Sequence, residues 1–274
     1  MSDIVLSAGV RSNLLQLQQT SDLMTRTQTR LATGKRVNSA LDNAINFFTA
    51  QGLDNRANDL SALLDSMSNA INTIQAANNG ITAITKLVQS AQSLVSQANQ
   101  TSDTAARATL STQFDALLTQ IGQLAGDSGF NGVNLLGGDN LTVNFNTDAL
   151  PASTTIDGVD YTNANATPLS VNNSVNNWGS STDISAASTQ LSAALTTLRS
   201  ESQTLSANLS TVQIRQDFTK ATINTLQNGS AALTLADSNE EGANLLALQT
   251  RQQLSTTALS LSAQADQNVL RLFQ

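Results

Sequence analysis

A long heptad pattern is the feature that most constrains how this chain can fold. From Leu53 to Val95, mostly apolar residues recur at alternating steps of four and three, which places them along one side of a helix. The positions are Leu53, Ala57, Leu60, Leu64, Met67, Ile71, Ile74, Asn78, Ile81, Thr85, Val88, Gln92 and Val95. A helix of this length would span about 65 Å, which is too long for the interior of a compact globule. The sequence therefore predicts an elongated bundle of helices.

The same spacing recurs before and after this segment. A first stripe ends just before Gly34, a residue type that commonly stops a helix: Val10, Leu14, Leu17, Ser21, Met24, Gln28 and Leu31. A shorter stripe follows a polar break at residues 100–103 and predicts a helix that folds back: Leu110, Phe114, Leu117, Ile121 and Leu124. A second long stripe matches the first long one: Leu191, Leu195, Leu198, Ser202, Leu205, Leu209, Val212, Gln216, Thr219, Ile223, Leu226, Ser230 and Leu233.

The last segment of the chain carries only a thin stripe. After an expected interruption from Asp237 to Gly242, a helix over about residues 243–272 is predicted. Its apolar positions are Leu245, Leu248, Leu259, Leu270 and Phe273, with many Gln and Ser between them. Helices obtain most of their stability from tertiary contacts, so we expect both thin end segments to need partners.

The middle of the chain has a different character. Five glycines between residues 126 and 138 predict turns. Segments 133–136 and 141–145 flank Gly137 to Asn140, which predicts a β-hairpin. From about residue 139 to 183 the helical period is lost and Asn, Ser and Thr are frequent, which predicts a short, surface-exposed insertion of loops and short strands.

Long helices on both sides of this insertion suggest two antiparallel halves whose termini meet. The predicted fold class is mainly α, an elongated antiparallel helical bundle or coiled coil with a small β-hairpin region and a short central insertion. The predicted domains are a terminal coiled-coil domain of residues 1–40 and 243–274, a helical body of residues 41–138 and 184–242 with the hairpin, and the insertion of residues 139–183.

Composition excludes most kinds of chemistry. The chain has no Cys and no His, which removes thiolate nucleophiles, imidazole bases and the usual transition-metal ligands. The net charge is −7 and no Lys or Arg lies between Arg107 and Arg199, which argues against a nucleic-acid partner. No apolar run approaches the length of a membrane span, and no cleavable secretion signal is recognisable. We therefore expect no enzyme activity, no cofactor, no metal, no nucleic acid and no membrane.

Two blocks of charge lie where the terminal helices are expected to meet the body. The basic block is Arg26, Arg30, Lys35 and Arg36, and the acidic block is Asp237, Glu240 and Glu241. Antiparallel pairing brings the two blocks close, which predicts an electrostatic clasp. The alternative is two solvated faces that contribute little to stability.

Two motifs have an enzymatic and a structural interpretation. Glu240 and Glu241 are adjacent acids, but neighbours on a helix point to different faces, so an anion-rich linker is favoured over acid and base chemistry. Ser39 and Asp42 have the spacing of a helix cap, and this interpretation is favoured over a nucleophile with its partner. Neither motif indicates an active site.

Three segments resemble characteristic segments of the bacterial flagellins. Residues 30–44, RLATGKRVNSALDNA, resemble the signature near the end of the first flagellin helix. Residues 129–136, GFNGVNLL, resemble the Phe-Asn-Gly turn of the flagellin body, and residues 250–273 resemble the C-terminal helix. The motif residues are Arg30, Gly34, Arg36, Asn38, Ser39, Asp42, Asn43, Phe130, Asn131 and Gly132. The resemblance covers about residues 1–146 and 184–274.

The resemblance implies a function and a location. A flagellin is a structural subunit that self-assembles into the bacterial flagellar filament for swimming motility, so a homopolymer is implied that is secreted without a cleaved signal and becomes part of the extracellular filament. Sister flagellins, a flagellar export chaperone, the filament cap and the hook-junction proteins are the implied partners. The terminal helices would carry the self-assembly contacts through Leu14, Leu17, Met24, Leu31, Leu245, Leu248, Leu259, Leu270 and Phe273.

A hook–filament junction protein is the alternative within the same class. Such proteins share the N-terminal pattern but usually depart from the C-terminal one, and residues 258–273 keep the flagellin pattern. An enzyme, such as a flagellin with a protease insert, would need a metal site of the His-Glu-x-x-His kind, and the chain has no His. The filament subunit is therefore the favoured function.

Overall fold

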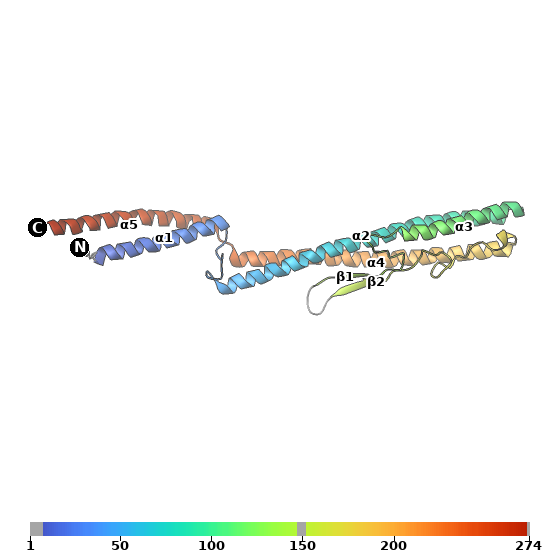
Figure 1. Ribbon diagram of the computed structural model, residues 1–274, viewed down its shortest axis with the longest axis horizontal. Coiled ribbons are helices and arrows are strands. Elements are labelled where there is room, and N and C mark those ends of the chain that lie inside the picture. Colours follow the sequence, from blue (N-terminus) through green and yellow to red (C-terminus); the bar gives the residue numbers. More distant parts are fainter. Residues whose placement is uncertain (1–7, 147–151, 273–274) are drawn as a thin grey trace. The chain divides into compact units, whose positions relative to one another are not determined.

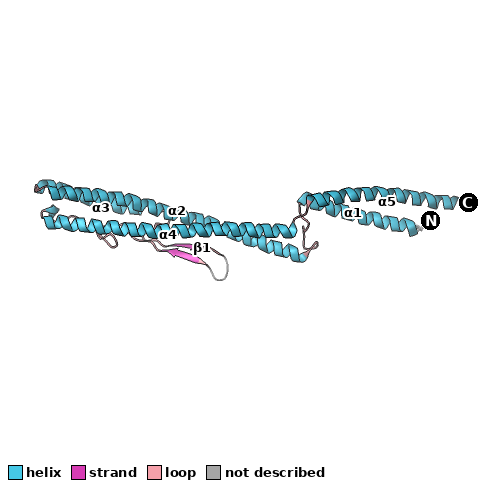
Figure 2. Ribbon diagram, turned by 180° about the vertical axis from the view of Figure 1, so that it is seen from behind, coloured by secondary structure: helices cyan, strands magenta, loops and turns pink. Residues whose placement is uncertain are grey.

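The computed structural model describes residues 8–146 and 152–272. In this part of the chain the fold is mainly α, as the sequence predicts, with five long helices and a small two-stranded sheet. The elements are α1 (Ala8–Thr33), α2 (Ala44–Gln100), α3 (Thr104–Gly126), β1 (Leu141–Asn144), β2 (Ser153–Ile156), the 3-10 helix η1 (Asn176–Trp178), α4 (Ser181–Thr234) and α5 (Ser238–Leu272). Figure 1 labels them, and Figure 2 shows how much of the chain is helical.

Contacts between residues divide the chain into two units, which are described separately. The terminal unit combines Met1–Arg56 with Thr225–Gln274, and the body unit is Ala57–Asn224. The division falls inside α2 and inside α4. The domain boundaries predicted at residues 40 and 243 lie instead near the ends of α1 and α5, and they stay a prediction about the assembled protein.

In the terminal unit, α1 and α5 lie side by side and run in opposite directions (Figure 1). Two contacts establish the direction. Near the start of α1 the Asn13 side-chain amide donates a hydrogen bond to Ser262 Oγ at 3.3 Å, and near its end Arg30 contacts Glu241. The predicted antiparallel pairing of the two terminal helices is confirmed.

Local chemistry explains where the helices begin and end. Gly34 follows α1 with a φ of 66°, a left-handed conformation that glycine adopts without steric cost, so the predicted stop is confirmed. After the predicted polar break, Asp103 caps α3 by accepting a hydrogen bond from Ala105 N at 2.9 Å. Asp237 accepts from Asn239 N at 2.8 Å and caps α5 in the same way.

The interruption expected from Asp237 to Gly242 is wrong in its length. The break between α4 and α5 comprises residues 235–237, and α5 already begins at Ser238. Glu240 and Glu241 therefore lie in the first turn of a helix rather than in an anion-rich linker. The reason is electrostatic, because the positive end of the helix dipole favours carboxylates there.

In the body unit, α2 and α4 lie side by side, and α3 folds back along α2 (Figures 1 and 2). Polar side chains also join α2 to α4. Ser202 Oγ donates to the Asn78 side-chain oxygen at 3.2 Å, and the Gln216 amide donates to Ser68 Oγ at 2.9 Å. Apolar side chains from all three helices form one core, whose removal from water is the main source of stability.

The buried side of each long helix matches the predicted stripe to a different degree. In α4 every stripe position from Leu191 to Leu233 is buried or half-buried. In α2, Leu60 and every seventh residue after it are buried, but the intervening stripe positions are only half-buried. The buried residues there come one position earlier and are mostly small: Ala70, Ala77, Ile84 and Ala91. Small side chains allow the helices to approach most closely, so they occupy the seam.

The β-hairpin exists, but the predicted pairing of its strands is wrong. β1 pairs antiparallel with β2, with Leu141 opposite Ile156, and not with residues 133–136. The earlier segment forms turns, which Asp139 closes by accepting a hydrogen bond from Asn134 N at 2.8 Å. The Asp139 side chain thus takes the Asn134 backbone N–H, which a paired strand would otherwise use.

The prediction that residues 139–183 form an exposed insertion needs correction for its side chains. Large apolar residues of this segment are buried in the body core: Ile156, Tyr161, Leu169, Val171 and Trp178. Trp178 packs on Phe114 of α3 with ring centroids 5.0 Å apart. Ser174 donates two hydrogen bonds to Asp115, from N at 2.7 Å and from Oγ at 2.8 Å. Residues 152–179, here called the strap, are therefore held onto the body by a few buried apolar side chains, which the predominantly polar composition of the segment does not reveal.

Replacement of Trp178 by Ala should destabilise the body unit by about 3–5 kcal/mol, because a fully buried aromatic side chain leaves a cavity in the core. Val175 is exposed, so Val175→Ala is a matched control that should change the free energy of unfolding by less than about 0.5 kcal/mol. Urea unfolding followed by far-ultraviolet circular dichroism measures both values. Equal effects of the two substitutions would contradict the docking of the strap.

Candidate self-assembly interface

The contact between α1 and α5 is a seam that contains both apolar and polar side chains. The buried and half-buried heptad positions of α1 are Val10, Asn13, Leu17, Thr20, Met24, Thr27 and Leu31. Those of α5 are Glu241, Leu245, Leu248, Gln252, Ser255, Leu259 and Ser262. Both sets follow steps of three and four, the spacing of a coiled coil. About half of the seam is polar, so it buries little apolar surface for its length.

Most of the residues predicted to carry self-assembly contacts lie in this seam, which is formed within one chain, so their role between subunits stays a prediction. Six of the nine are buried or half-buried between the two helices: Leu17, Met24, Leu31, Leu245, Leu248 and Leu259. Leu14 is exposed and lies at the edge. Leu270 belongs to α5, but its side chain and all of Phe273 lie outside the described residues.

Sequence reasoning missed the polar members of the α1 seam. Counting steps of four and then three from Val10 leads to Ser21 and Gln28, whereas the buried residues are Thr20 and Thr27, one position earlier. Thr20 Oγ1 donates to the Gln16 carbonyl at 2.8 Å, which satisfies the hydroxyl within its own helix. The signal in the sequence is the seven-residue spacing of Asn13, Thr20 and Thr27, which indicates a heptad position occupied by small polar residues.

The side of α5 that points away from α1 carries exposed leucines. Leu246, Leu254 and Leu261 are all more than half exposed. At about 100° per residue they fall on the side of the helix opposite the seam. Part of this side is a shallow groove lined by Leu246, Thr250 and Leu254, among others. We call these three leucines the outer leucine stripe, and it is apolar surface that a single chain leaves in water.

The links between α1 and α2 and between α4 and α5 pair with each other through their backbones. We call the paired segments, residues 34–37 and 234–236, the joint. Arg36 N donates a hydrogen bond to the Thr234 carbonyl at 2.7 Å, and Ala236 N donates one to the Gly34 carbonyl at 3.0 Å. Two antiparallel strands of backbone therefore leave the terminal coiled coil together.

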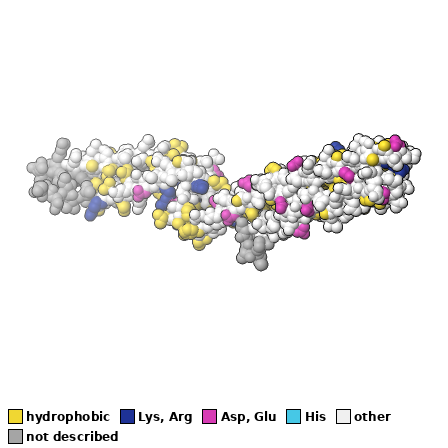
Figure 3. All heavy atoms as spheres, turned by 45° about the vertical axis from the view of Figure 1, so that its right-hand side comes forward, with side chains coloured by type: hydrophobic (Ala, Val, Ile, Leu, Met, Phe, Trp, Pro, Cys, Tyr) yellow, Lys and Arg dark blue, Asp and Glu magenta, His cyan; other side chains and the backbone are white. Residues whose placement is uncertain are grey.

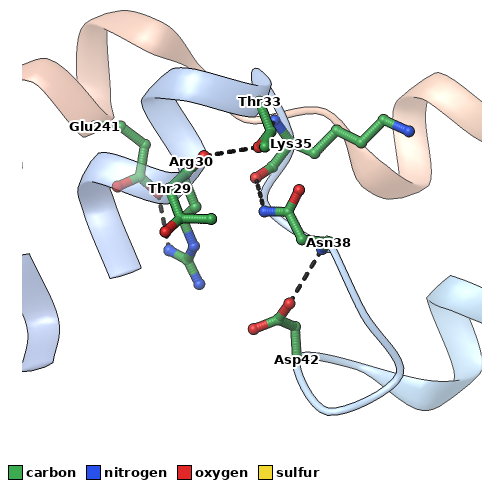
Figure 4. A network of polar contacts seen from close by, with 7 residues as sticks. All are labelled: Thr29, Arg30, Thr33, Lys35, Asn38, Asp42 and Glu241. Carbon is green, nitrogen blue, oxygen red and sulfur yellow. Dashed lines mark hydrogen bonds and ion pairs between the residues drawn. The ribbon is translucent and has the colours of Figure 1, made fainter. Parts of the chain in front are cut away.

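One ion pair lies next to the joint. Arg30 Nη1 donates to Glu241 Oε1 at 2.8 Å, and Glu241 is only 5% exposed (Figure 4). Arg30 Nε and Glu241 Oε2 are buried as well and have no hydrogen-bond partner among the described residues. A charge-assisted bond of this kind is stronger than a neutral one. Within the described part of the chain, the predicted clasp thus takes the form of the pair of Arg30 and Glu241, which joins the last turn of α1 to the first turn of α5.

Asp42 closes the loop that follows the joint. Its carboxylate accepts a hydrogen bond from Asn38 N at 3.1 Å (Figure 4). It also accepts one from Ser39 N at 3.1 Å. These bonds hold the pKa of Asp42 below its ordinary value of 3.8, and the bond from Asn38 N has the largest effect. The cap of α2 is a different residue, Asn43, which accepts from Asn46 N at 3.0 Å. The helix cap predicted at Ser39 and Asp42 is therefore wrong: these two residues close the loop, and the cap is the next residue, Asn43.

The second motif forms a tight turn in the body unit. Phe130 and Val133 exchange backbone hydrogen bonds of 2.9 and 3.0 Å. Between them Asn131 and Gly132 both have positive φ, 50° and 83°, as a two-residue turn of this type requires. The Phe-Asn-Gly motif is thus explained by backbone geometry rather than by chemistry.

The comparisons with known proteins agree with this architecture. Residues 8–141 match the family model described as the bacterial flagellin N-terminal helical region. Over its full length the chain is 30% identical to flagellin FljK of Caulobacter vibrioides, 99% of which is covered. The chain belongs to the bacterial flagellins. It is also 27% identical to the flagellin of Brucella melitensis, with both chains covered completely.

Among solved structures, the Bacillus cereus flagellin resembles this flagellin with a TM-score of 0.46 and 19% identity, over 58% of this chain and 88% of that one. Family membership makes the protein a structural subunit of the flagellar filament, which associates with copies of itself. No helix within residues 8–146 and 152–272 is long and apolar enough to cross a membrane. The flagellin motif residues thus lie at the end of α1, in the joint, in the loop that Asp42 closes and in a two-residue turn of the body unit.

Reversal of the ion pair in this flagellin should show energetic coupling. Arg30→Glu or Glu241→Arg alone places like charges side by side and should destabilise the protein, whereas the double reversal should restore about 1–3 kcal/mol. Urea unfolding of the four chains measures this coupling. Arg36→Glu with Glu240→Arg is the matched control, because both of these side chains are exposed and their effects should simply add. Additive effects at Arg30 and Glu241 would refute the clasp.

Loop closure by Asp42 should make stability depend on pH. Because its folded-state pKa is lowered, the stabilisation is fully present above the ordinary value of 3.8 and is lost as the pH falls through the lowered pKa. The unmodified protein should therefore exceed Asp42→Asn in free energy of unfolding at about pH 6, and the gap should close at about pH 2. Asp59→Asn, which removes an exposed carboxylate from α2, controls for net charge. A gap that does not change with pH would contradict this role of Asp42.

Proposed function

We propose that α1 and α5 polymerise the protein by packing against the terminal helices of other copies, and that the filament grows through these contacts. The observation that supports this proposal best is the outer leucine stripe, Leu246, Leu254 and Leu261, on the side of α5 that α1 does not cover. Contact with a neighbouring subunit would remove these leucines from water, which is favourable.

The polar seam gives a second reason for the terminal helices to need neighbours. Thr20 and Thr27 occupy buried positions where leucine would bury far more apolar surface. An isolated pair of helices with so little apolar burial is weakly stable, and further packing has to supply the rest. Polymerisation and ordering of these helices are therefore coupled in our proposal, and stability depends on subunit concentration.

The proposed arrangement follows the predicted domains. Residues 1–40 and 243–274 form the inner contacts of the filament, residues 41–138 and 184–242 form the next shell, and residues 139–183 face outward. The strap supports this order, because its apolar side chains are buried while its Asn, Ser and Thr residues remain largely at the surface. Repeated contacts between different surfaces of identical subunits produce an open helical polymer.

The partners that we propose are sister flagellins, a flagellar export chaperone, and the filament cap and hook-junction proteins. Caulobacter vibrioides has several flagellins, and FljK, FljM and FljN are each 30% identical to this chain, which supports the mixing of sister subunits. Secretion without a cleaved signal and an extracellular location in the filament belong to the same proposal. No observation favours the hook-junction alternative.

Replacement of Leu246, Leu254 and Leu261 by Gln should abolish elongation of filament seeds, because the outer leucine stripe loses its apolar contacts. Electron microscopy of purified protein mixed with short filament fragments measures elongation, and circular dichroism checks that helix content is kept. Thr256→Gln with Ser260→Gln changes exposed polar positions of the same helix and should leave elongation intact.

A chain without residues 1–35 and 245–274 should stay monomeric in the same assay. Normal elongation by the leucine variant would refute the role of the stripe. Elongation by the truncated chain would refute assembly through the terminal helices altogether.

A further inference from the structure

Two exposed apolar patches lie outside the terminal coiled coil and take no part in the contacts described so far. The first, here called the loop patch, consists of Leu41, Ile45 and Phe48, which are 99%, 79% and 60% exposed. Leu41 lies in the loop that Asp42 closes, and the other two lie in the first turns of α2. Phe47 packs edge-on against Phe48 with ring centroids 5.5 Å apart, which supports the orientation of the exposed ring.

The second patch, here called the α4 patch, consists of Ile214 and Phe218, which are 66% and 65% exposed. They are four residues apart, so both side chains lie on one face of α4. Arg215 lies beside them, and its guanidinium is held over the Phe145 ring at 5.4 Å. Figure 3 shows that apolar side chains gather at the surface in several places, between side chains that are mostly uncharged.

Exposed aromatic rings of this kind are typical of binding surfaces. The two patches also differ in charge. Asp42 is next to Leu41 in the loop patch, and its carboxylate is fixed by two backbone hydrogen bonds. Beside the α4 patch lie two cations, Arg215 and Lys220, and one carboxylate, Asp217, which pairs with Lys220 at 3.6 Å, so the charge next to this patch is positive on balance. The patches therefore complement each other in charge as well as in apolar character.

We infer that the loop patch of one subunit docks on the α4 patch of a second copy of this chain. The inference rests on the filament function, because an open polymer needs two different surfaces that complement each other. Pairing of a loop patch with another loop patch is disfavoured, since it would place Asp42 against Asp42. It would also close a two-fold dimer instead of continuing the polymer. The contact adds a specified pair of surfaces to the terminal-helix contacts proposed above.

Cysteine cross-linking tests the contact directly, because the natural chain has no Cys. Phe48→Cys and Phe218→Cys are made in separate chains, so that a cross-link between the two sites joins two subunits. Both variants are copolymerised with an excess of unmodified protein on filament seeds and treated with a short bis-maleimide reagent. We expect a covalent dimer that contains one chain of each kind in filaments, and no dimer in an unpolymerised mixture.

The controls separate the contact from assembly in general. Gln113→Cys, an exposed site on α3, replaces Phe218→Cys in a parallel mixture and should give no dimer with Phe48→Cys. If a phenylalanine variant folds but is left out of the filaments, Ile45→Cys or Ile214→Cys takes its place in the same patch. Filaments that contain both cysteines without a mixed dimer would overturn the inference. A dimer of Phe48→Cys with itself would also overturn it, and failure of the unmodified chain to elongate seeds would refute the filament proposal instead.

Discussion

Close packing of antiparallel helices through small side chains is the constraint on which this structure depends. In the body unit the small residues are alanines such as Ala77 and Ala91, so close approach also removes apolar surface from water. In the terminal unit they are Thr20 and Thr27, so the same approach buries hydroxyls instead. The two units thus share one packing geometry but differ in the side chains that they bury. This difference explains why the body unit has an apolar core of its own, and it underlies our proposal that the terminal unit packs against neighbouring subunits.

Within the terminal unit, the joint holds the two links between helices together. Backbone hydrogen bonds tie the two links together, and the pair of Arg30 and Glu241 fastens α1 to α5 directly beside them. The flagellin signature runs from the joint into α2, and three of its residues have separate structural roles: Gly34 ends α1, Asp42 closes the loop and Asn43 caps α2.

Much of this architecture could be predicted from the sequence, because heptad spacing and the stop at Gly34 are local signals. In α4 every predicted stripe position is buried or half-buried. In α1 and α2 about half of the predicted positions lie one residue after the residue that is most buried. Steps of three and of four residues both keep side chains on one face of a helix, so the spacing alone does not decide between them. The partner of β1 and the burial of Trp178 depend on contacts far apart in the sequence. Composition alone pointed to exposure of that segment and was misleading.

The docking of the strap has a spectroscopic consequence. Trp178 is the only tryptophan of the chain, and it is fully buried against Phe114 in the body unit. Intrinsic fluorescence excited at the red edge of protein absorption therefore reports on one place, the attachment of the strap to α3. Because α1 and α5 hold no tryptophan, ordering of the terminal helices is silent in this signal. The protein thus carries a natural probe that separates unfolding of its body from changes at its ends.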